Sequence, residues 1–193
     1  MTTYTVSTGV TLNGLSLGSN DDLIVEAGGI AIGTELAGGA AADVYGTTSF
    51  TDISNGSLTV FAGGHAFDDL VGGYVGLVIS SGGQTTGDII NYGEEYVSSG
   101  GTANTASVEQ GGELNVARGG KAISTVISGG ALYVSSGGKS SATVIFENGS
   151  ETISSGGAAY KTVLNGGSQT VYGTGASASG TVVNSGGTEV LQD

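Results

Sequence analysis

His65 is the only histidine in the chain, and it lies close in sequence to Asp68 and Asp69. A histidine beside a carboxylate can act as a general base when a serine lies within hydrogen-bond reach. In a chain this rich in serine, however, such a neighbour is expected by chance. His65 also directly follows Gly63-Gly64, a place typical of a polar residue in an exposed turn. We therefore interpret His65 as an exposed corner residue and not as a catalytic base.

Three pairs of adjacent acidic residues offer the oxygen ligands that Ca²⁺ prefers: Asp21-Asp22, Asp68-Asp69 and Glu94-Glu95. A calcium-binding β-roll would repeat an aspartate together with its glycines, and this chain does not. Neighbouring residues of a strand also point to opposite faces, so one pair cannot form a site unaided. The pattern favours solvated acidic surfaces, with structural calcium as the weaker alternative. We predict no metal site and no cofactor.

Hydrolysis or cleavage of a glycan would need two carboxylates at a fixed separation, or a metal beside basic residues. The only cations are Arg118, Lys121, Lys139 and Lys161, and no long segment is available to build a cleft. Lys121 and Lys139 are 18 residues apart, as are Glu95 and Glu113, which indicates exposed stacks of like residues. We predict that the chain is not an enzyme.

The elements that position these residues follow from an internal repeat. An aliphatic residue recurs every 18–19 residues, with one shorter interval, at Val6, Val25, Val44, Val60, Ile79, Val97, Val116, Val134, Ile153 and Val171, and Val190 would begin an eleventh unit. Glycine pairs follow as AGG at 62–64 and as SSGG at 80–83, 98–101, 135–138 and 154–157. A unit of this length cannot bury a core alone, so the units must stack.

Each period contains two aliphatic segments, each followed by a tight corner that is usually glycine-rich. Short strands with corners at this spacing predict an all-β fold, a single-stranded parallel β-helix (β-solenoid) of about ten 18–19-residue coils, with right-handed winding. Aliphatic side chains should point inward, and the tyrosines before them, Tyr96 and Tyr133, should point outward. We expect one β-solenoid repeat domain over residues 1–193, with divergent coils over 1–74 and regular SSGG-type coils over 75–193.

The net charge of −13 is unevenly distributed, because residues 1–95 carry eleven acidic residues and no Lys or Arg. Such a surface repels phosphate backbones, which excludes nucleic acid as a partner. No apolar run approaches the roughly 18 residues of a membrane helix, so this segment should not insert into a membrane. The chain has no cysteine and no charged, apolar leader, which fits a secreted bacterial protein whose signal peptide was removed or never present.

The strings VSSGGTA, VISGGALYV, LNGGSQTV and VVNSGGTEV resemble the passenger repeats of AIDA-type autotransporter adhesins, closely over residues 75–193 and more loosely over 1–74. The resemblance implies a β-helical passenger that is secreted or held at the bacterial outer membrane. It further implies adhesion, through self-association or a receptor on a host or bacterial cell. The membrane barrel that exports such passengers is not in this sequence, so we expect a segment of a longer protein.

Corner serines accept O-linked heptose in some members of that family, which implies a glycosyltransferase as a further partner. Carried over to this chain, the serines directly before a glycine pair are Ser81, Ser99, Ser136 and Ser155, with Ser128 and Ser185 at the other corner. The neighbouring residues Ser80, Ser98, Ser135 and Ser154 are second choices. Ala62 and Arg118 occupy the serine position in two coils, so we expect an interrupted pattern of modification.

Two functions remain compatible with the sequence. The first is an adhesive, glycosylated segment on the bacterial surface. The second is a passive structural spacer or scaffold segment of a larger secreted protein. Self-association that depends on surface residues would distinguish the first from the second.

Overall fold

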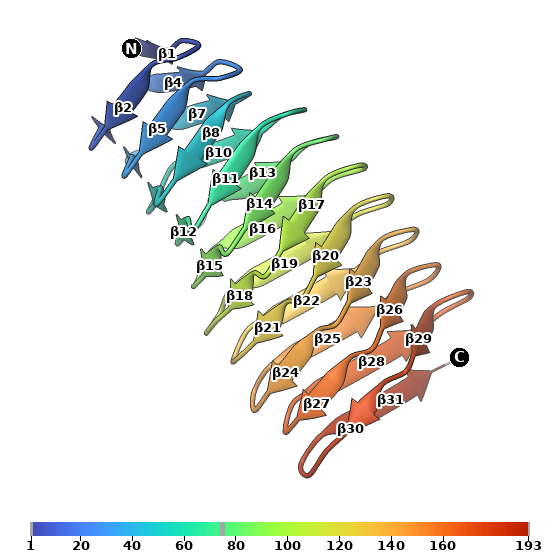
Figure 1. Cartoon of the computed structure of the whole chain (residues 1–193). Helices are drawn as coiled ribbons and strands as arrows, with labels where there is room; N and C mark the ends of the chain where they lie inside the picture. The colour runs from blue at the N-terminus through green and yellow to red at the C-terminus, as the bar shows by residue number, and fades with distance from the viewer. Residues whose placement is uncertain (1, 74–75, 193) are drawn as a thin grey trace.

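The computed structural model describes residues 2–73 and 76–192, which form a rod of stacked coils with the two ends of the chain at opposite ends of the rod (Figure 1). Each of the ten complete coils contributes one strand to each of three sheets, here called sheets A, B and C in the order in which the chain visits them, and β31 adds an eleventh strand to sheet A. A coil is numbered by its strand in sheet A, so that coil 1 begins with β1 and coil 4 with β10. The predicted β-solenoid of about ten coils is confirmed.

The strands are short and follow one another in a fixed order. Sheet A consists of β1 (Thr3–Val6), β4 (Asp22–Val25), β7 (Ala41–Val44), β10 (Ser57–Val60), β13 (Leu77–Ile79), β16 (Glu94–Val97), β19 (Glu113–Val116), β22 (Ala131–Val134), β25 (Ser150–Ile153), β28 (Ser168–Tyr172) and β31 (Thr188–Gln192). Sheet B consists of β2 (Thr11–Asn13), β5 (Ile30–Ile32), β8 (Thr47–Ser49), β11 (His65–Phe67), β14 (Gln84–Thr86), β17 (Thr102–Asn104), β20 (Lys121–Ile123), β23 (Lys139–Ser141), β26 (Ala158–Tyr160) and β29 (Ser177–Ser179). Sheet C consists of β3 (Ser16–Leu17), β6 (Glu35–Leu36), β9 (Asp52–Ile53), β12 (Leu70–Val71), β15 (Ile89–Ile90), β18 (Ser107–Val108), β21 (Val126–Ile127), β24 (Val144–Phe146), β27 (Val163–Asn165) and β30 (Val182–Val183).

The aliphatic repeat of the sequence sets the register of sheet A. Val6 pairs with Val25 and Val25 with Val44, and the same alignment continues along the parallel sheet to Val171. The last pair differs from the prediction, since Val171 lies opposite Leu191 and not Val190. The final coil is longer than the repeat predicts, which moves Val190 to the outward face.

Two corners per coil were predicted, but the chain bends three times. The additional bend, between sheets B and C, uses no glycine pair. It turns on a single residue with positive φ, as at Phe50 (φ 55°), Asp68 (54°) and Lys161 (57°). Non-glycine residues adopt positive φ rarely, and the side chains at these positions do not indicate it. In four coils the residue is a single glycine, at Gly14, Gly33, Gly87 and Gly180, and in six it is not, so the glycine pairs did not predict the bend.

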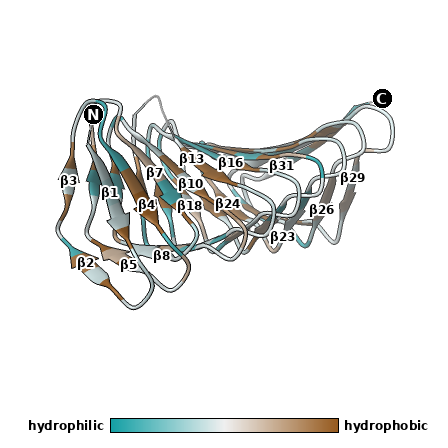
Figure 2. Ribbon diagram, turned by 90° about the horizontal axis from the view of Figure 1, so that it is seen from above, coloured by the Kyte–Doolittle hydropathy of each residue, from teal (hydrophilic) through white to brown (hydrophobic). Residues whose placement is uncertain are grey.

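In each coil, sheet A makes the largest contribution to the core, and sheets B and C make smaller ones. Sheet A supplies two inward residues, usually Leu and then Val or Ile, and sheet C supplies one aliphatic residue. Sheet B presents small inward residues such as Ala66, Ala103 and Ala122, which leave room for the long side chains of sheet A. Figure 2 shows hydrophobic residues recurring on strands along the whole rod. Tyr96 and Tyr133 are exposed, as predicted.

Polar side chains also enter the interior of the rod. Buried threonines line the bend between sheets B and C at Thr34, Thr51, Thr125, Thr143 and Thr162. Among the residues that the structure describes there is no helix that could span a membrane.

Candidate functional site

The corner between sheets A and B is the most regular part of the surface. In coil 5 the chain passes from Ile79 through Ser80, Ser81, Gly82 and Gly83 into β14. Gly82 has φ of 80°, a conformation that glycine adopts at no steric cost. A side chain at Gly83 would overlap the carbonyl oxygen of Val60 in the coil below. The two glycines therefore serve different purposes, one for the turn and one for close stacking.

Backbone hydrogen bonds join these corners into a continuous column. The amide of Gly82 donates to the carbonyl of Gly100 at 3.1 Å, and that of Gly100 to Gly119 at 3.0 Å. The same contact continues from Gly119 to Gly137 and from Gly137 to Gly156. Each corner is thereby held directly above its predecessor.

This column places the predicted serines in one exposed line. A Cβ built on Gly100 would lie 2.8 Å from Oγ of Ser81, and one built on Gly156 would lie 2.9 Å from Oγ of Ser136. Each hydroxyl thus lies beside the corner of the next coil. The structure brings together Ser81, Ser99, Ser136 and Ser155, all exposed, and we call them the serine column. Arg118 occupies the same position in coil 7, and Ala62 in coil 4.

The remaining predicted serines are placed differently. Ser128 and Ser185 are exposed at the corner between sheets C and A, in coils 7 and 10. Ser128 directly follows its strand, and its amide donates to Val108; the equivalent bond in coil 10 is made by Asn184, the residue before Ser185. They are therefore not equivalent and form no column. Of the second-choice serines, Ser154 is half-buried, and its hydroxyl donates to the carbonyl of Val134 at 3.3 Å.

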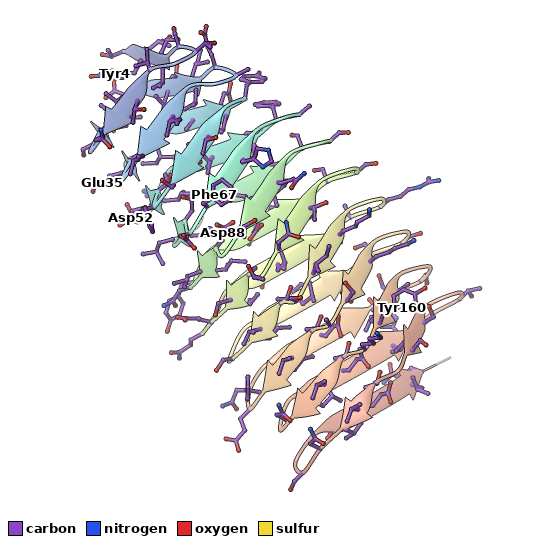
Figure 3. The ribbon with its side chains drawn as sticks, in the orientation of Figure 1. Tyr4, Glu35, Asp52, Phe67, Asp88 and Tyr160 are labelled. Carbon is purple, nitrogen blue, oxygen red and sulfur yellow. The ribbon has the colours of Figure 1, made fainter. Side chains whose placement is uncertain are left out.

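Among the described residues, His65 makes no side-chain hydrogen bond. It lies on the outward face of β11 with its ring 6.1 Å from that of Phe67. Figure 3 shows Phe67 on the outer face of the rod. Asp68 is exposed in the following bend, and Asp69 points into the core. Histidine and buried carboxylate are thus on opposite sides of the coil wall.

The structure corrects the interpretation of the acidic pairs as solvated surface. Asp69 and Glu95 are fully buried, so two of the three pairs are not simply solvated surface. The stacked pair on the outer face of sheet A is Glu94 with Glu113, because Glu95 aligns with Leu114 inside the rod. Lys121 and Lys139 are register partners, as expected. Within residues 2–73 and 76–192, no group of three His, Asp or Glu side chains could hold a metal ion.

One buried carboxylate is fully hydrogen-bonded. Oε1 of Glu151 accepts from Ser140 at 2.5 Å, and Oε2 accepts from Thr162 at 2.9 Å and from Gln169 at 2.7 Å. Burial raises the pKa of Glu151, and these hydrogen bonds oppose the rise. Gln169 in turn accepts from Thr181 at 2.9 Å. A polar network therefore replaces the leucine of neighbouring coils.

A second group of buried carboxyls, Asp69, Asp88 and Glu95, is poorly hydrogen-bonded, and we call it the acidic cluster. Oδ1 of Asp69 accepts from the amide of Thr51 at 2.7 Å, and Oδ1 of Asp88 accepts from the amide of Asp69 at 3.1 Å. Oε1 of Glu95 accepts from the hydroxyl of Thr85 at 2.9 Å. The other oxygen of each carboxyl is buried and has no hydrogen-bond partner among the residues that the structure describes.

Sequence reasoning missed these buried carboxyls, although a signal was present. Glu95 and Glu151 lie two residues before the aliphatic repeat positions Val97 and Ile153, and alternation places them on the inward face. Asp69 and Asp88 follow the bend between sheets B and C, which glycine spacing did not reveal.

Comparison with known proteins agrees with this geometry. Residues 89–149 match the family model "Adhesin of bacterial autotransporter system, probable stalk". The solved structure of a hyper-glycosylated TibA fragment, whose modification is catalysed by TibC, is 28% identical. The alignment covers 99% of this chain and 92% of that chain, with a TM-score of 0.55. The comparison with curated protein sequences found no match.

The chain is similar to AIDA-type adhesin stalks. The resemblance inferred from the repeats is thereby confirmed. The matched stalk segment contains Ser99, Ser128 and Ser136, and the similarity to the TibA fragment extends over the remaining coils. The serine column is an exposed feature of this rod that recurs at the same corner in coils 5, 6, 8 and 9.

Proposed function

We propose that this chain is a bacterial surface or secreted adhesin segment whose serine column is O-glycosylated and whose rod mediates adhesion or self-association. The observation that carries the proposal is the alignment of Ser81, Ser99, Ser136 and Ser155 at one exposed corner. The similarity to a hyper-glycosylated adhesin fragment supports it. Because the corners repeat at the coil spacing of about 4.8 Å, a transferase that binds one corner meets the same local surface at the next.

Modification is tested by producing the chain with and without a heptosyltransferase of autotransporter adhesins and measuring the intact mass. We expect a series of added sugars that maps to the serine column by peptide fragmentation. Changing all four column serines to alanine should remove most of the added mass. The matched control is Ser154→Ala, whose half-buried hydroxyl is bonded to Val134 and whose loss should leave the series unchanged. Added mass that persists without the column would refute this assignment.

We base the proposed self-association on the uneven charge. Residues 1–95 carry eleven acidic residues and no Lys or Arg, whereas the stacked cations Lys121 and Lys139 project from sheet B in coils 7 and 8. Two rods that pack side by side in opposite directions bring the cations of each against the acidic half of the other, and electrostatic complementarity of this kind guides docking. The proposal includes such antiparallel pairing.

Sedimentation of the chain at increasing salt tests this pairing. We expect association at low salt that weakens as screening increases, and that is lost in a Lys121→Glu, Lys139→Glu variant. The control Lys161→Glu changes the net charge by the same amount per residue at a different position. A rod that stays monomeric at every salt concentration and binds no cells would leave the passive spacer as the function, which the even stacking of the coils equally supports.

A further inference from the structure

The acidic cluster lies at one place in the interior of coils 4 to 6. Asp69 and Asp88 occupy the same position of successive coils, directly after the bend between sheets B and C, and Figure 3 shows Asp88 on that side of the rod. Glu95 enters from sheet A in coil 6, and its contact with Thr85 brings it to sheet B of coil 5. Three carboxyls therefore share a small region of the core.

The hydrogen bonds available to this cluster are too few for three carboxylates. An ionised carboxylate has about four acceptor positions, yet each of the three has one oxygen with a donor and one with none. A protonated carboxyl needs fewer acceptor contacts and supplies a donor of its own. Protons bound to the carboxyls would therefore offset the shortage of hydrogen-bond donors in the cluster.

In the described ranges 2–73 and 76–192, no positively charged side chain lies against the cluster. The other titratable side chains on the elements around it point away from the core: Asp52 on β9, His65 on β11, Asp68 in the following bend, Tyr92 before β16, Glu94 and Tyr96 on β16, Glu109 after β18 and Glu113 on β19. Except for His65 and the tyrosines these are acids, and no Lys or Arg occurs before Arg118. Like charges and burial both disfavour ionisation.

We infer that Asp69, Asp88 and Glu95 form a buried proton-binding site that couples the stability of coils 4 to 6 to pH. When the site holds its protons, the three carboxyls are neutral and the bend between sheets B and C stays closed. When the protons leave, three like charges remain in the core with one donor each, and the bend opens to hydrate them. The rest of the rod does not respond in this way.

The direction of the response follows from linkage. Burial, opposed by the hydrogen bond from the Asp69 amide, raises the pKa of Asp88 to about 7. Burial and the neighbouring carboxyls raise the pKa of Asp69 and of Glu95 well above the usual range. The unfolded chain releases these protons near about pH 4. The folded state therefore binds more protons between about pH 4 and 7, and its stability falls as pH rises through that window.

Glu151 provides an internal control. It is buried like Glu95 and occupies the same position of sheet A, but both of its oxygens are hydrogen-bonded. A carboxylate with these donors needs no proton to satisfy its oxygens. Coils 8 to 10 should therefore keep their protection where coils 4 to 6 lose it.

Amide hydrogen exchange of the full chain, measured between about pH 5 and 8 and corrected for intrinsic rates, tests the inference. We expect protection in the strands of coils 4 to 6 to fall at least about ten-fold more across this range than protection around Glu151. Infrared spectroscopy of the unmutated chain should show protonated carboxyls at pH 5, and their absorbance should fall as pH rises past about 7, where Asp88 ionises. A uniform response along the rod, or carboxyls already ionised at pH 5, would overturn the inference.

Variants assign the effect to the cluster. Asp88→Asn and Glu95→Gln keep the shape of the side chains and remove ionisation, so each should flatten the pH dependence of coils 4 to 6. Asp88→Thr serves as a second variant, because Thr34, Thr125 and Thr143 occupy the same position of other coils. Glu151→Gln should leave the pH dependence of coils 4 to 6 intact. An unchanged pH response in folded Asp88→Asn, Asp88→Thr and Glu95→Gln would contradict the proposed site.

Discussion

Gln169 donates a hydrogen bond of 2.7 Å from Nε2 to Oε2 of Glu151, one coil away inside the rod. Both side chains occupy the inward position of sheet A at which Leu114 and Leu132 lie in preceding coils. The pair shows that the interior tolerates a carboxylate when neighbouring coils supply enough donors. The stability of this part of the rod then depends on those donors.

Replacing Gln169 with leucine should destabilise the chain by about 1–3 kcal/mol, because the buried Oε2 of Glu151 loses a donor. The midpoint of urea unfolding measures the effect. Gln84→Leu, a change on the exposed face of sheet B, should stay within about 0.5 kcal/mol of the unmutated chain. Equal effects of the two changes would show that the hydrogen bond contributes nothing.

The two buried glutamates should respond in opposite ways to leucine. Glu95→Leu restores the residue type of its partners Leu77 and Leu114 and removes a buried carboxyl with an unsatisfied oxygen, so we expect a gain of about 1–3 kcal/mol at pH 8. The gain should shrink toward pH 5, since the raised pKa of Glu95 means that its destabilising ionisation is lost as pH falls.

Glu151→Leu should instead cost about 1–3 kcal/mol, because Ser140, Thr162 and Gln169 lose their common acceptor. Both variants are compared by urea unfolding at the two pH values. Stabilisation by both leucines, or by neither, would argue against the difference in hydrogen bonding that we describe.

The glycines of one corner should differ in their tolerance of alanine. Gly64→Ala should destabilise strongly, by about 3 kcal/mol or more, because its Cβ would overlap the carbonyl oxygen of Val44. Gly63→Ala meets open space and should cost only about 1–2 kcal/mol for its φ of 82°. Gly63→Asn is the control, since asparagine tolerates this conformation. Thermal unfolding ranks the three, and a Gly63 variant as unstable as Gly64→Ala would be the contrary result.

Arg118 interrupts the serine column, and Arg118→Ser should restore it. With the glycosyltransferase present, we expect one additional modified corner in the intact mass, mapped to position 118. Arg118→Ala removes the same bulk without adding a hydroxyl and should gain nothing. Absence of modification at the new serine, while Ser99 and Ser136 on either side are modified, would mean that column position alone does not select the acceptor.

Much of the fold was predictable because stacking repeats one local rule. The interval between Val60 and Ile79 is the register of sheet A, so sequence spacing translates directly into strand pairing. The third bend was not predictable in this way. At Phe50 and Lys161 the chain adopts positive φ because the strands on either side are fixed by their neighbours in the stack, and no local residue preference requires it.

The residues of the candidate site also differ in whether the sequence predicts their positions. The serine column follows from spacing, since Ser81 and Ser99 precede equivalent glycines. The burial of Asp69 and Glu95 does not follow from spacing. Two adjacent acidic residues are expected to be solvated unless it is known which of them lies on the inward face of the strand. Which carboxylate finds donors depends on side chains one coil away, such as Gln169 for Glu151, and this is information that local patterns do not contain.

The hydrogen bonds that join equivalent strands run from coil to coil, along the length of the rod. A mechanical load applied between its ends therefore acts on the coil junctions in series, and the weakest junction yields first. Each coil that detaches would release roughly 60 Å of extended chain. If the proposed site holds its protons in acid, the junctions around Asp69, Asp88 and Glu95 would yield at a higher load at low pH than at neutral pH.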